Sequence, residues 1–222
     1  INSRPFQRLR HIRQLAMSSY VYPGATHTRF EHSLGVMELA TRVYDSMFDN
    51  SKITDNVRKI LPEILDDHEL GYWRTVVRMA ALSHDLGHLP FSHGAEDLLP
   101  KGMKHENLSW DIIHSDEMAP LWDALRIKAA DVAKIALGQK EIQELGLPAK
   151  LTTWENILAE IIVGNMFGAD RMDYLLRDSY HAGVAYGRFD HERLVATLRI
   201  LPKAPEGKSE EDQGNEPAIG VE

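Results

Sequence analysis

Residues that can cap a helix recur along this chain, each followed by apolar side chains three or four positions apart. Thr28 and Glu31 have the spacing of a capping box, in which each side chain satisfies a backbone N–H of the first turn. Thr152 and Glu155 repeat that spacing before Ile157. Apolar spacing of three and four aligns side chains on one face of a helix, whereas a half-buried strand needs strict alternation. The sequence therefore predicts an all-α fold.

The predicted helices are spread over the first 201 residues. The first follows Ser3 and has Pro5 in its first turn, where proline costs no hydrogen bond. The helix predicted over residues 73–86 is followed directly by Gly87, and glycine is common just after the last residue of a helix. The helices are predicted over residues 3–15, 28–47, 73–86, 152–162, 168–177 and 190–201, with a loop over residues 21–27. The buried face of the second helix is predicted to be Phe30, Leu34, Met37, Val43 and Met47.

A chain of 222 residues can bury one sizeable core, so residues 1–201 are predicted to form one domain. Residues 203–216 are rich in Pro, Gly, Glu and Asp, a composition that cannot bury a core. Residues 202–222 are therefore predicted to be a flexible, acidic, irregular segment, with residues 218–222 starting a strand. Because the chain begins with Ile1 rather than Met and its last residues start a strand, we expect an excerpt of a longer chain whose C-terminal part is absent.

The composition narrows the possible partners. The formal net charge of -8 argues against extended nucleic-acid binding, since such binding normally uses a basic face. No apolar run is long enough to cross a bilayer, and no N-terminal segment has the layout of a signal peptide. We therefore expect no membrane among the partners of this chain. The absence of cysteine excludes disulfides and thiolate metal sites and fits a cytoplasmic protein.

Histidines cluster in one short part of the chain. Five of the 11 are His84, His88, His93, His105 and His114. His84 and Asp85 are adjacent at the end of the predicted helix over residues 73–86. Neighbouring side chains at a helix end diverge, so an imidazole and a carboxylate there can meet one ion from adjacent sides. A core histidine hydrogen-bonded to a carboxylate would give the same dipeptide.

Two further residues favour a metal site over that alternative. His32 lies one turn into the helix that Thr28 begins, and Asp170 opens another predicted helix. Together with His84 and Asp85 they form a nitrogen and oxygen ligand set that suits Mn, Fe, Zn or Ni better than Mg alone. Four protein ligands leave octahedral positions open for water and a phosphoryl oxygen, as a catalytic site requires.

Several short motifs then appear in a familiar order. They are Gln7-Arg8-Leu9-Arg10, Tyr22-Pro23-Gly24-Ala25, Thr28-Arg29-Phe30-Glu31-His32-Ser33-Leu34-Gly35, His84-Asp85-Leu86-Gly87-His88-Leu89-Pro90-Phe91-Ser92-His93, and Asp170-Arg171-Met172-Asp173-Tyr174 with Arg177-Asp178. Over residues 1 to about 200 the chain resembles the HD-domain phosphohydrolase superfamily, specifically its deoxynucleotide triphosphohydrolase branch. It looks most like the sterile-alpha-motif-and-HD-domain hydrolases and their bacterial relatives.

That resemblance implies an HD-domain helical bundle around one or two divalent metal ions. It implies hydrolysis of a deoxynucleoside triphosphate (dNTP) to the deoxynucleoside and triphosphate. The implied metal ligands are His32, His84, Asp85 and Asp170, with Mn, Fe, Zn, Ni or Mg all open. The implied catalytic residues are His105 as the general acid for the leaving 5′ oxygen, and His88, His93 and Arg29 near the water and the α-phosphate. Plainer roles stay open: His88 and His93 as loop histidines, and His105 as a residue that only opens a helix.

The resemblance also implies substrate contacts. Gln14 and Asp178 would hold the sugar 3′-hydroxyl, and Tyr174 would crowd the 2′ position, which favours deoxyribose. Tyr174 lies one turn after Asp170, so a packing role is equally open. Arg171 stands where the family has a lysine for the distal phosphates and keeps the positive charge.

Regulation is implied as well, since Gln7 and Arg10 fall where relatives bind a nucleotide activator between the subunits of a homo-oligomer. Asn2 departs from the acidic residue of the family pattern, which removes the argument for guanine-specific activation, and a solvated helix face would explain Gln7 and Arg10 as well. Two other functions stay open: hydrolysis of another nucleotide phosphoester, such as a monophosphate or an alarmone, and a nucleotide sensor without catalysis.

Overall fold

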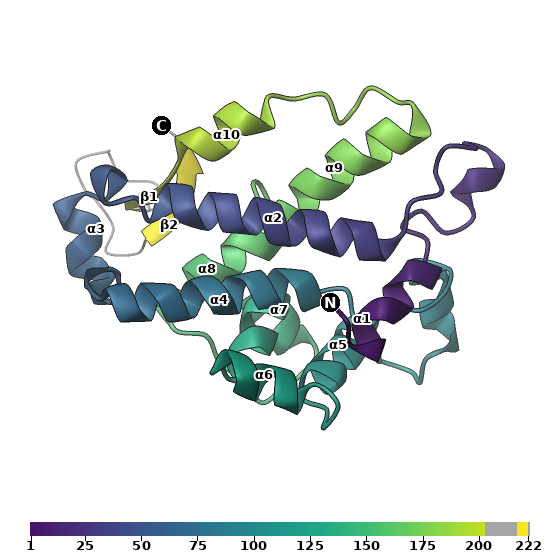
Figure 1. The fold of residues 1–222 in the computed structure, drawn as a ribbon, viewed down its shortest axis with the longest axis horizontal. Coiled ribbons are helices and arrows are strands. Elements are labelled where there is room, and N and C mark those ends of the chain that lie inside the picture. The colour runs from purple at the N-terminus through teal and green to yellow at the C-terminus, as the bar shows by residue number, and fades with distance from the viewer. Residues whose placement is uncertain (203–216, 222) are drawn as a thin grey trace.

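The computed structural model describes residues 1–202 and 217–221 and is mainly helical (Figure 1), which confirms the predicted fold class. The helices are α1 (Arg4–Arg8), α2 (Arg29–Met47), α3 (Asp55–Ile60), α4 (Asp67–Ser83), α5 (His105–Ile113), α6 (Ala119–Leu125), α7 (Ala129–Glu144), α8 (Thr153–Val163), α9 (Ala169–Ala182) and α10 (His191–Thr197). Short 3₁₀ helices are η1 (Leu9–His11), η2 (Ser18–Tyr20), η3 (Asn50–Lys52), η4 (Pro62–Leu65) and η5 (Ser92–Leu98). The strands are β1 (Leu198–Pro202) and β2 (Pro217–Val221).

Helix α2 is the central element of the bundle. It lies between α4 on one side and α9 on the other, while α7 and α8 pack on each other and α7 also packs on α4 (Figure 1). Of the face predicted to be buried, Phe30, Val43 and Met47 are buried, but Leu34 and Met37 are only partly buried. Because α2 has neighbours on two sides, its buried surface is wider than one apolar stripe and includes polar side chains.

The two predicted capping boxes have different outcomes. At α8 the box is confirmed, since Thr152 Oγ1 accepts from Glu155 N at 3.2 Å and Glu155 Oε2 accepts from Thr152 N at 2.7 Å. At α2 the prediction is wrong, because the Thr28 hydroxyl contacts the Glu31 carboxylate at 3.4 Å and caps no backbone group. The backbone N–H of Arg29, at the start of α2, donates to the carbonyl oxygen of Ile12.

Helix α4 begins earlier and ends earlier than the pattern predicts. Asp66 caps it by accepting from the N–H groups of His68 and Glu69 at 2.8 and 3.3 Å. The helix ends at Ser83, so His84 is its C-cap residue and residues 84–87 form a turn. The first predicted helix is also shorter: α1 and η1 end at residue 11, and the chain is extended at Ile12. Helices α3, α6 and α7 lie outside the predicted ranges, and α5 begins at His105, where the sequence had left a helix start open.

The last predicted helix is wrong beyond residue 197. Leu198 and Ile200 are buried, which is the alternation of a strand, and β1 pairs antiparallel with β2 so that Leu198 lies opposite Val221. A strand predicted near residues 218–222 is therefore confirmed at Pro217–Val221, and it pairs with the domain. The acidic segment predicted over residues 203–216 lies outside the described residues.

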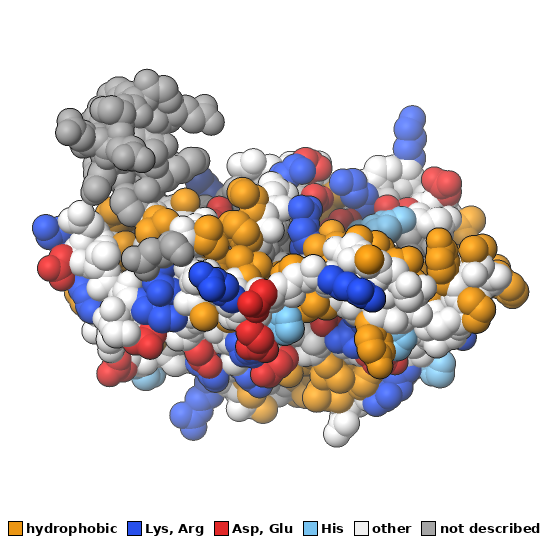
Figure 2. Space-filling model, turned by 90° about the horizontal axis from the view of Figure 1, so that it is seen from above, with side chains coloured by type: hydrophobic (Ala, Val, Ile, Leu, Met, Phe, Trp, Pro, Cys, Tyr) orange, Lys and Arg blue, Asp and Glu red, His pale blue; other side chains and the backbone are white. Residues whose placement is uncertain are grey.

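The surface of the described part carries mixed charge. On the face in Figure 2, Lys and Arg side chains are interspersed with acidic, hydrophobic and uncharged groups rather than gathered into one continuous basic area. Within residues 1–202 and 217–221, no helix combines the length and the apolar character needed to cross a bilayer.

Candidate metal centre

Four predicted ligands from three separate segments converge at one place. His32 comes from α2, His84 and Asp85 from the turn that follows α4, and Asp170 from the first turn of α9. His32 Nε2 lies 3.0 Å from Asp170 Oδ1 and 3.7 Å from Asp85 Oδ2. His84 Nε2 lies 3.4 Å from Asp85 Oδ1 and 3.6 Å from Asp170 Oδ1. Ligand atoms of His32, His84 and Asp85 all lie within 4.8 Å of one another, so they could hold one cation, and Asp170 Oδ1 faces both imidazole nitrogens.

The other nitrogen of each imidazole is already engaged. His84 Nδ1 lies 2.7 Å from the carbonyl oxygen of Ala81, so it carries the proton and donates it. His32 Nδ1 lies 2.7 Å from Asp173 Oδ2. Both arrangements leave Nε2 as the nitrogen that can bind a cation once it carries no proton, and such partners are usual behind metal-binding histidines.

Asp173 is a residue that the sequence reasoning missed. Its carboxylate is buried and also accepts from Arg177 Nε and Nη2 at 2.8 Å each. The close approach of α2 and α9 makes this possible, because a Cβ on Gly35 would lie 1.8 Å from Asp173 Oδ1. The available signal was its spacing, three residues after Asp170 and therefore on the same side of a helix.

The electrostatics of the four residues fit a divalent cation. Burial raises the pKa of Asp85, but the charges of Arg29 and His84 outweigh it and hold that pKa well below the usual range. Burial lowers the pKa of His32, yet the nearby carboxylates, Asp170 foremost, raise it to about 10. The Nε2 atoms of His32 and His84 are buried without a hydrogen-bond partner among the described residues. Carboxylates that face buried, unpartnered nitrogens are stabilised when a cation lies between them.

Arg29 is a buried neighbour of this group. Its guanidinium donates to Asp85 Oδ2 and to Ser92 Oγ, which fixes it beside the ligand set. Its backbone N–H donates to the Ile12 carbonyl at 2.9 Å, so the chain before α2 is tied to the start of that helix. The structure thus gives this arginine a carboxylate partner that the sequence reasoning did not anticipate.

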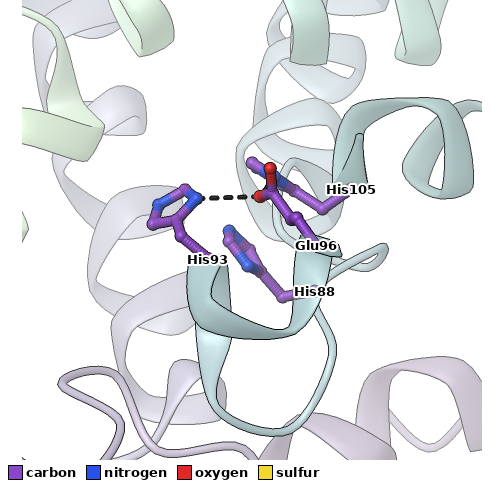
Figure 3. A group of neighbouring side chains, drawn as sticks. All are labelled: His88, His93, Glu96 and His105. Atoms are coloured by element: carbon purple, nitrogen blue, oxygen red, sulfur yellow. Dashed lines mark hydrogen bonds and ion pairs between the residues drawn. The ribbon is translucent and has the colours of Figure 1, made fainter. Parts of the chain in front are cut away.

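A second group of histidines lies next to the first (Figure 3). His88 is buried, with Nε2 3.4 Å from Asp85 Oδ1, and its ring stacks on His105 at a centroid distance of 3.7 Å. Burial lowers the pKa of His88 to about 4. Glu96, which the sequence reasoning also missed, lies 2.6 Å from His105 Nδ1 and 2.8 Å from His93 Nδ1 through its Oε1 atom. Its spacing of three residues from His93 was the only local signal.

Both groups border a cavity of about 690 Å³. Most of the predicted site residues line it, namely Gln14, Arg29, His84, Asp85, His88, His93, His105, Asp170 and Tyr174. His32 lies behind the cavity wall, fully buried. The cavity therefore brings the candidate metal ligands and the predicted catalytic histidines to one space.

Other predicted residues lie away from the cavity wall. Arg171 is exposed, and Asp178 is buried on α9 and paired with His27. Gln7 and Arg10 hydrogen-bond to each other at 2.8 Å near the N-terminus, and the Arg10 guanidinium lies over the ring of Phe30.

Comparisons with known proteins show which family the chain belongs to. Residues 29–162 match the model of the family described as "HD domain". The chain is 38% identical over 200 residues to uncharacterized protein YwfO of Bacillus subtilis, covering 90% of the chain and 39% of that protein. It is 32% identical over 225 residues to the deoxynucleoside triphosphate triphosphohydrolase SAMHD1 of Gallus gallus, covering 90% of the chain and 33% of that protein.

A solved structure supports the same relationship. The crystal structure of a hypothetical protein from Aquifex aeolicus matches with a TM-score of 0.69 and 35% identity, over 99% of this chain and 48% of that one. The chain thus spans less than half the length of the relatives described here. The family match covers more than half of the chain, and it includes the His32, His84 and Asp85 positions. This chain belongs to the HD domain family.

Proposed function

We propose that this chain is the metal-binding part of an HD phosphohydrolase that cleaves dNTPs to a deoxynucleoside and triphosphate. The observation that carries the proposal is the convergence of His32, His84, Asp85 and Asp170 beside a cavity that the predicted catalytic histidines also line. The choice of dNTP over other phosphoesters is supported by the relatives whose names state that activity, such as SAMHD1 of Gallus gallus.

The reaction breaks the bond between the α-phosphorus and the 5′ oxygen. A water oxygen bonds to phosphorus, and the departing 5′ oxygen needs a proton to leave as the deoxynucleoside hydroxyl. A divalent cation, when bound, lowers the pKa of a water ligand and offsets the charge of the phosphate. In the proposal His105 donates the proton. Its Nδ1 is held by Glu96 at 2.6 Å, so Nε2 is the nitrogen left to exchange a proton with substrate.

The remaining residues bind and orient the substrate in this proposal. Arg29 and Arg171 supply positive charge to the phosphates, which phosphoryl transfer requires around the equatorial oxygens. Tyr174 lines the cavity one turn after Asp170, where it would exclude a 2′-hydroxyl. Gln14 and Asp178 would receive the 3′-hydroxyl. His88, which burial keeps neutral near pH 7, and His93 would position the attacking water and the α-phosphate.

Product analysis tests the reaction directly. The full-length protein, supplied with Mn²⁺, is incubated with each of the four dNTPs, and the phosphorus products are identified by ³¹P NMR. We expect intact triphosphate and the deoxynucleoside. The variants His84→Asn and Asp170→Asn should lose turnover, and His105→Asn should lower kcat by about 10²- to 10⁴-fold. His114→Asn is the matched control, because that histidine is exposed and its imidazole contacts Trp110, through the carbonyl oxygen and the indole ring, rather than any residue of the candidate site.

Each other outcome points to a different function. Release of orthophosphate or pyrophosphate would contradict the proposed reaction. Turnover of a monophosphate or an alarmone, without turnover of any dNTP, would show that the chain is an HD phosphohydrolase with a different substrate. Nucleotide binding without turnover in the presence of Mn²⁺ would favour a sensor.

Regulation is a separate part of the proposal. Gln7 and Arg10 are the proposed contacts for a nucleotide activator between subunits of a homo-oligomer. Analytical ultracentrifugation with and without added nucleotide tests this. A monomer with full activity would contradict it and would leave the hydrolytic proposal intact.

A further inference from the structure

Arg8 is a half-buried arginine that the proposed chemistry does not use. It is the last residue of α1, yet its guanidinium contacts the turn that follows α4, 78 and 80 positions further along the chain. Its Nη1 donates to the carbonyl oxygen of His88 at 2.8 Å, and its Nη2 donates to the carbonyl oxygen of Leu86. One planar group therefore binds two backbone oxygens of the turn that carries His84 and Asp85.

Those two carbonyl oxygens depend on Arg8 for their hydrogen bonds. Leu86 and His88 are buried, and within the described part of the chain no backbone N–H donates to either carbonyl. A buried carbonyl without a donor costs free energy, so the guanidinium does here what a local cap does at other helix ends. The rigid fork of an arginine can bind both oxygens at once, whereas the ammonium of a lysine is a single point of charge.

The same turn has two further hydrogen bonds. The Gly87 N–H donates to Ser109 Oγ of α5 at 2.9 Å. Within the turn, the His88 N–H donates to the carbonyl oxygen of Asp85 at 3.1 Å. The turn is therefore held by α5 through Ser109 and by α1 through Arg8, and the ligand Asp85 lies within it.

Helix α1 has other contacts that attach it to the domain. Phe6 and Leu9 are buried, and the Phe6 ring packs on the Phe30 ring with centroids 4.8 Å apart. Burial lowers the pKa of the Arg8 guanidinium, because removing a charge from water disfavours the charged form. Apolar contacts already hold α1, so a partly desolvated charge at its end favours a role at the turn.

We infer that Arg8 is a positioning residue of the candidate metal centre. It fixes the backbone from Leu86 to His88, and through this backbone it orients the Asp85 carboxylate and the His88 ring. His88 Nε2 lies 3.4 Å from Asp85 Oδ1, so a shift of the turn displaces two neighbouring side chains of the site. The inference rests on the proposed function for any effect on turnover, but its effect on metal binding is measured without a nucleotide.

Chemical rescue of a metal-binding defect provides the test. Arg8→Ala in the full-length protein removes the guanidinium and leaves space for a free one. We expect Mn²⁺ to bind about 10- to 100-fold more weakly, the usual loss when a group that orients a ligand is removed. Guanidinium chloride at about 50 mM, far below the molar concentrations that unfold proteins, should restore most of the affinity. Calorimetric titration of the metal-free protein with Mn²⁺ measures both effects.

Arg4→Ala is the matched control. Arg4 lies one turn earlier on α1, is exposed, and makes no side-chain hydrogen bond or ion pair with any residue that the structure describes. Its variant should bind Mn²⁺ as the wild type does, with and without guanidinium. Sodium chloride at the same concentration is the control for ionic strength.

A second variant keeps the experiment decisive. Arg8→Lys retains a charge but cannot bridge both carbonyl oxygens, so we expect an intermediate loss of Mn²⁺ affinity. Guanidinium should not restore that loss, because the lysine side chain fills the space. If Arg8→Ala does not fold, Arg8→Lys becomes the test, and wild-type affinity in this variant would contradict the inference.

The two proposals fail in different ways. If Arg8→Ala binds Mn²⁺ as tightly as the wild type, or binds it weakly and is not rescued by guanidinium, Arg8 only attaches α1 to the domain. The inference is then wrong, while the proposed hydrolysis of dNTPs stands. If the wild-type protein releases no triphosphate from any dNTP, the proposed function fails, and a rescued Mn²⁺ affinity would still support the role of Arg8 at the metal centre.

Discussion

The two imidazoles of the candidate metal centre are each oriented by a partner on the far side of the ring. His84 uses the carbonyl of Ala81 within its own helix turn, whereas His32 depends on Asp173 from α9. A carboxylate behind an imidazole fixes the ring and raises its basicity as a ligand. The two histidines therefore differ in how much of their orientation comes from a distant part of the sequence.

Replacing the distant partner tests this arrangement. Asp173→Asn should weaken Mn²⁺ binding about 10- to 100-fold, because the amide cannot replace the charge behind His32. Calorimetric titration of the metal-free protein measures the change. Asp45→Asn is the matched control, since Asp45 is an exposed residue of α2 that pairs with Arg74. Equal affinity in the wild type and Asp173→Asn would contradict a role for this carboxylate in the metal site.

The pKa of His32 predicts a pH dependence of metal binding. Nearby carboxylates, against the effect of burial, raise the pKa to about 10, so the metal-free imidazole is protonated at pH 7. A cation needs the neutral imidazole and must displace that proton. We expect release of about one proton per ion at pH 7, and an affinity that falls as the pH falls, by up to about tenfold per pH unit.

Titrations in two buffers of different ionisation enthalpy count the released protons. His32→Asn should release fewer of them. Binding of Mn²⁺ to the wild type without proton release would show that His32 is not a ligand.

At the scale of elements, the site depends on how closely two segments approach. The turn after α4 contacts the start of α5, where a Cβ on Gly87 would lie 1.8 Å from the His105 carbonyl oxygen and 2.5 Å from Ser109 N. Ser109 Oγ bridges the same segments, accepting from Gly87 N and donating to the His84 carbonyl, each at 2.9 Å. The position of the proposed general acid is therefore coupled to the turn that carries His84 and Asp85.

A methyl group at this contact should separate the segments. We expect Gly87→Ala to lower the free energy of unfolding by about 1–3 kcal/mol through overpacking, and to lower kcat because His105 moves. Gly71→Ala in α4 is the control, since nothing lies within 4 Å of its added Cβ. There the change should raise stability by about 0.5–1 kcal/mol. Chemical denaturation measures both, and a neutral Gly87→Ala would contradict the described packing.

At the scale of the whole molecule, the candidate metal centre joins segments that are far apart in the sequence. His32 and Asp170 are 3.0 Å apart although 138 residues separate their positions (170 − 32). A ligand that binds the folded chain and not the unfolded one stabilises the fold by mass action. A cation held across α2, α4 and α9 should therefore stabilise the bundle as a whole.

Metal addition should raise the melting temperature. At 100 times the dissociation constant the gain is about 2.7 kcal/mol, which corresponds to roughly 5 to 10 °C for a domain of this size. Differential scanning calorimetry with Mn²⁺ and with a chelator measures the shift. Asp170→Ala should remove most of it, and an unchanged shift in that variant would exclude Asp170 as a ligand.

The sequence by itself determined the helical class, the cap of α8 at Thr152 and the residue types that meet at the centre. These features are local or chemical: helical spacing and a capping box involve residues a few positions apart, and His or Asp side chains have ligand atoms wherever they lie. The order of short motifs added the family, which the comparisons support.

Only the tertiary structure decided which nitrogen of each histidine is free, which carboxylates orient His32 and His105, and that His27 contacts Asp178. It also showed that the predicted end of α10 is the strand β1. The backbone hydrogen bonds of β1 come from β2, which follows much later in the sequence. These outcomes depend on contacts between distant positions. Local periodicity cannot specify such contacts, because they form only when the helices pack.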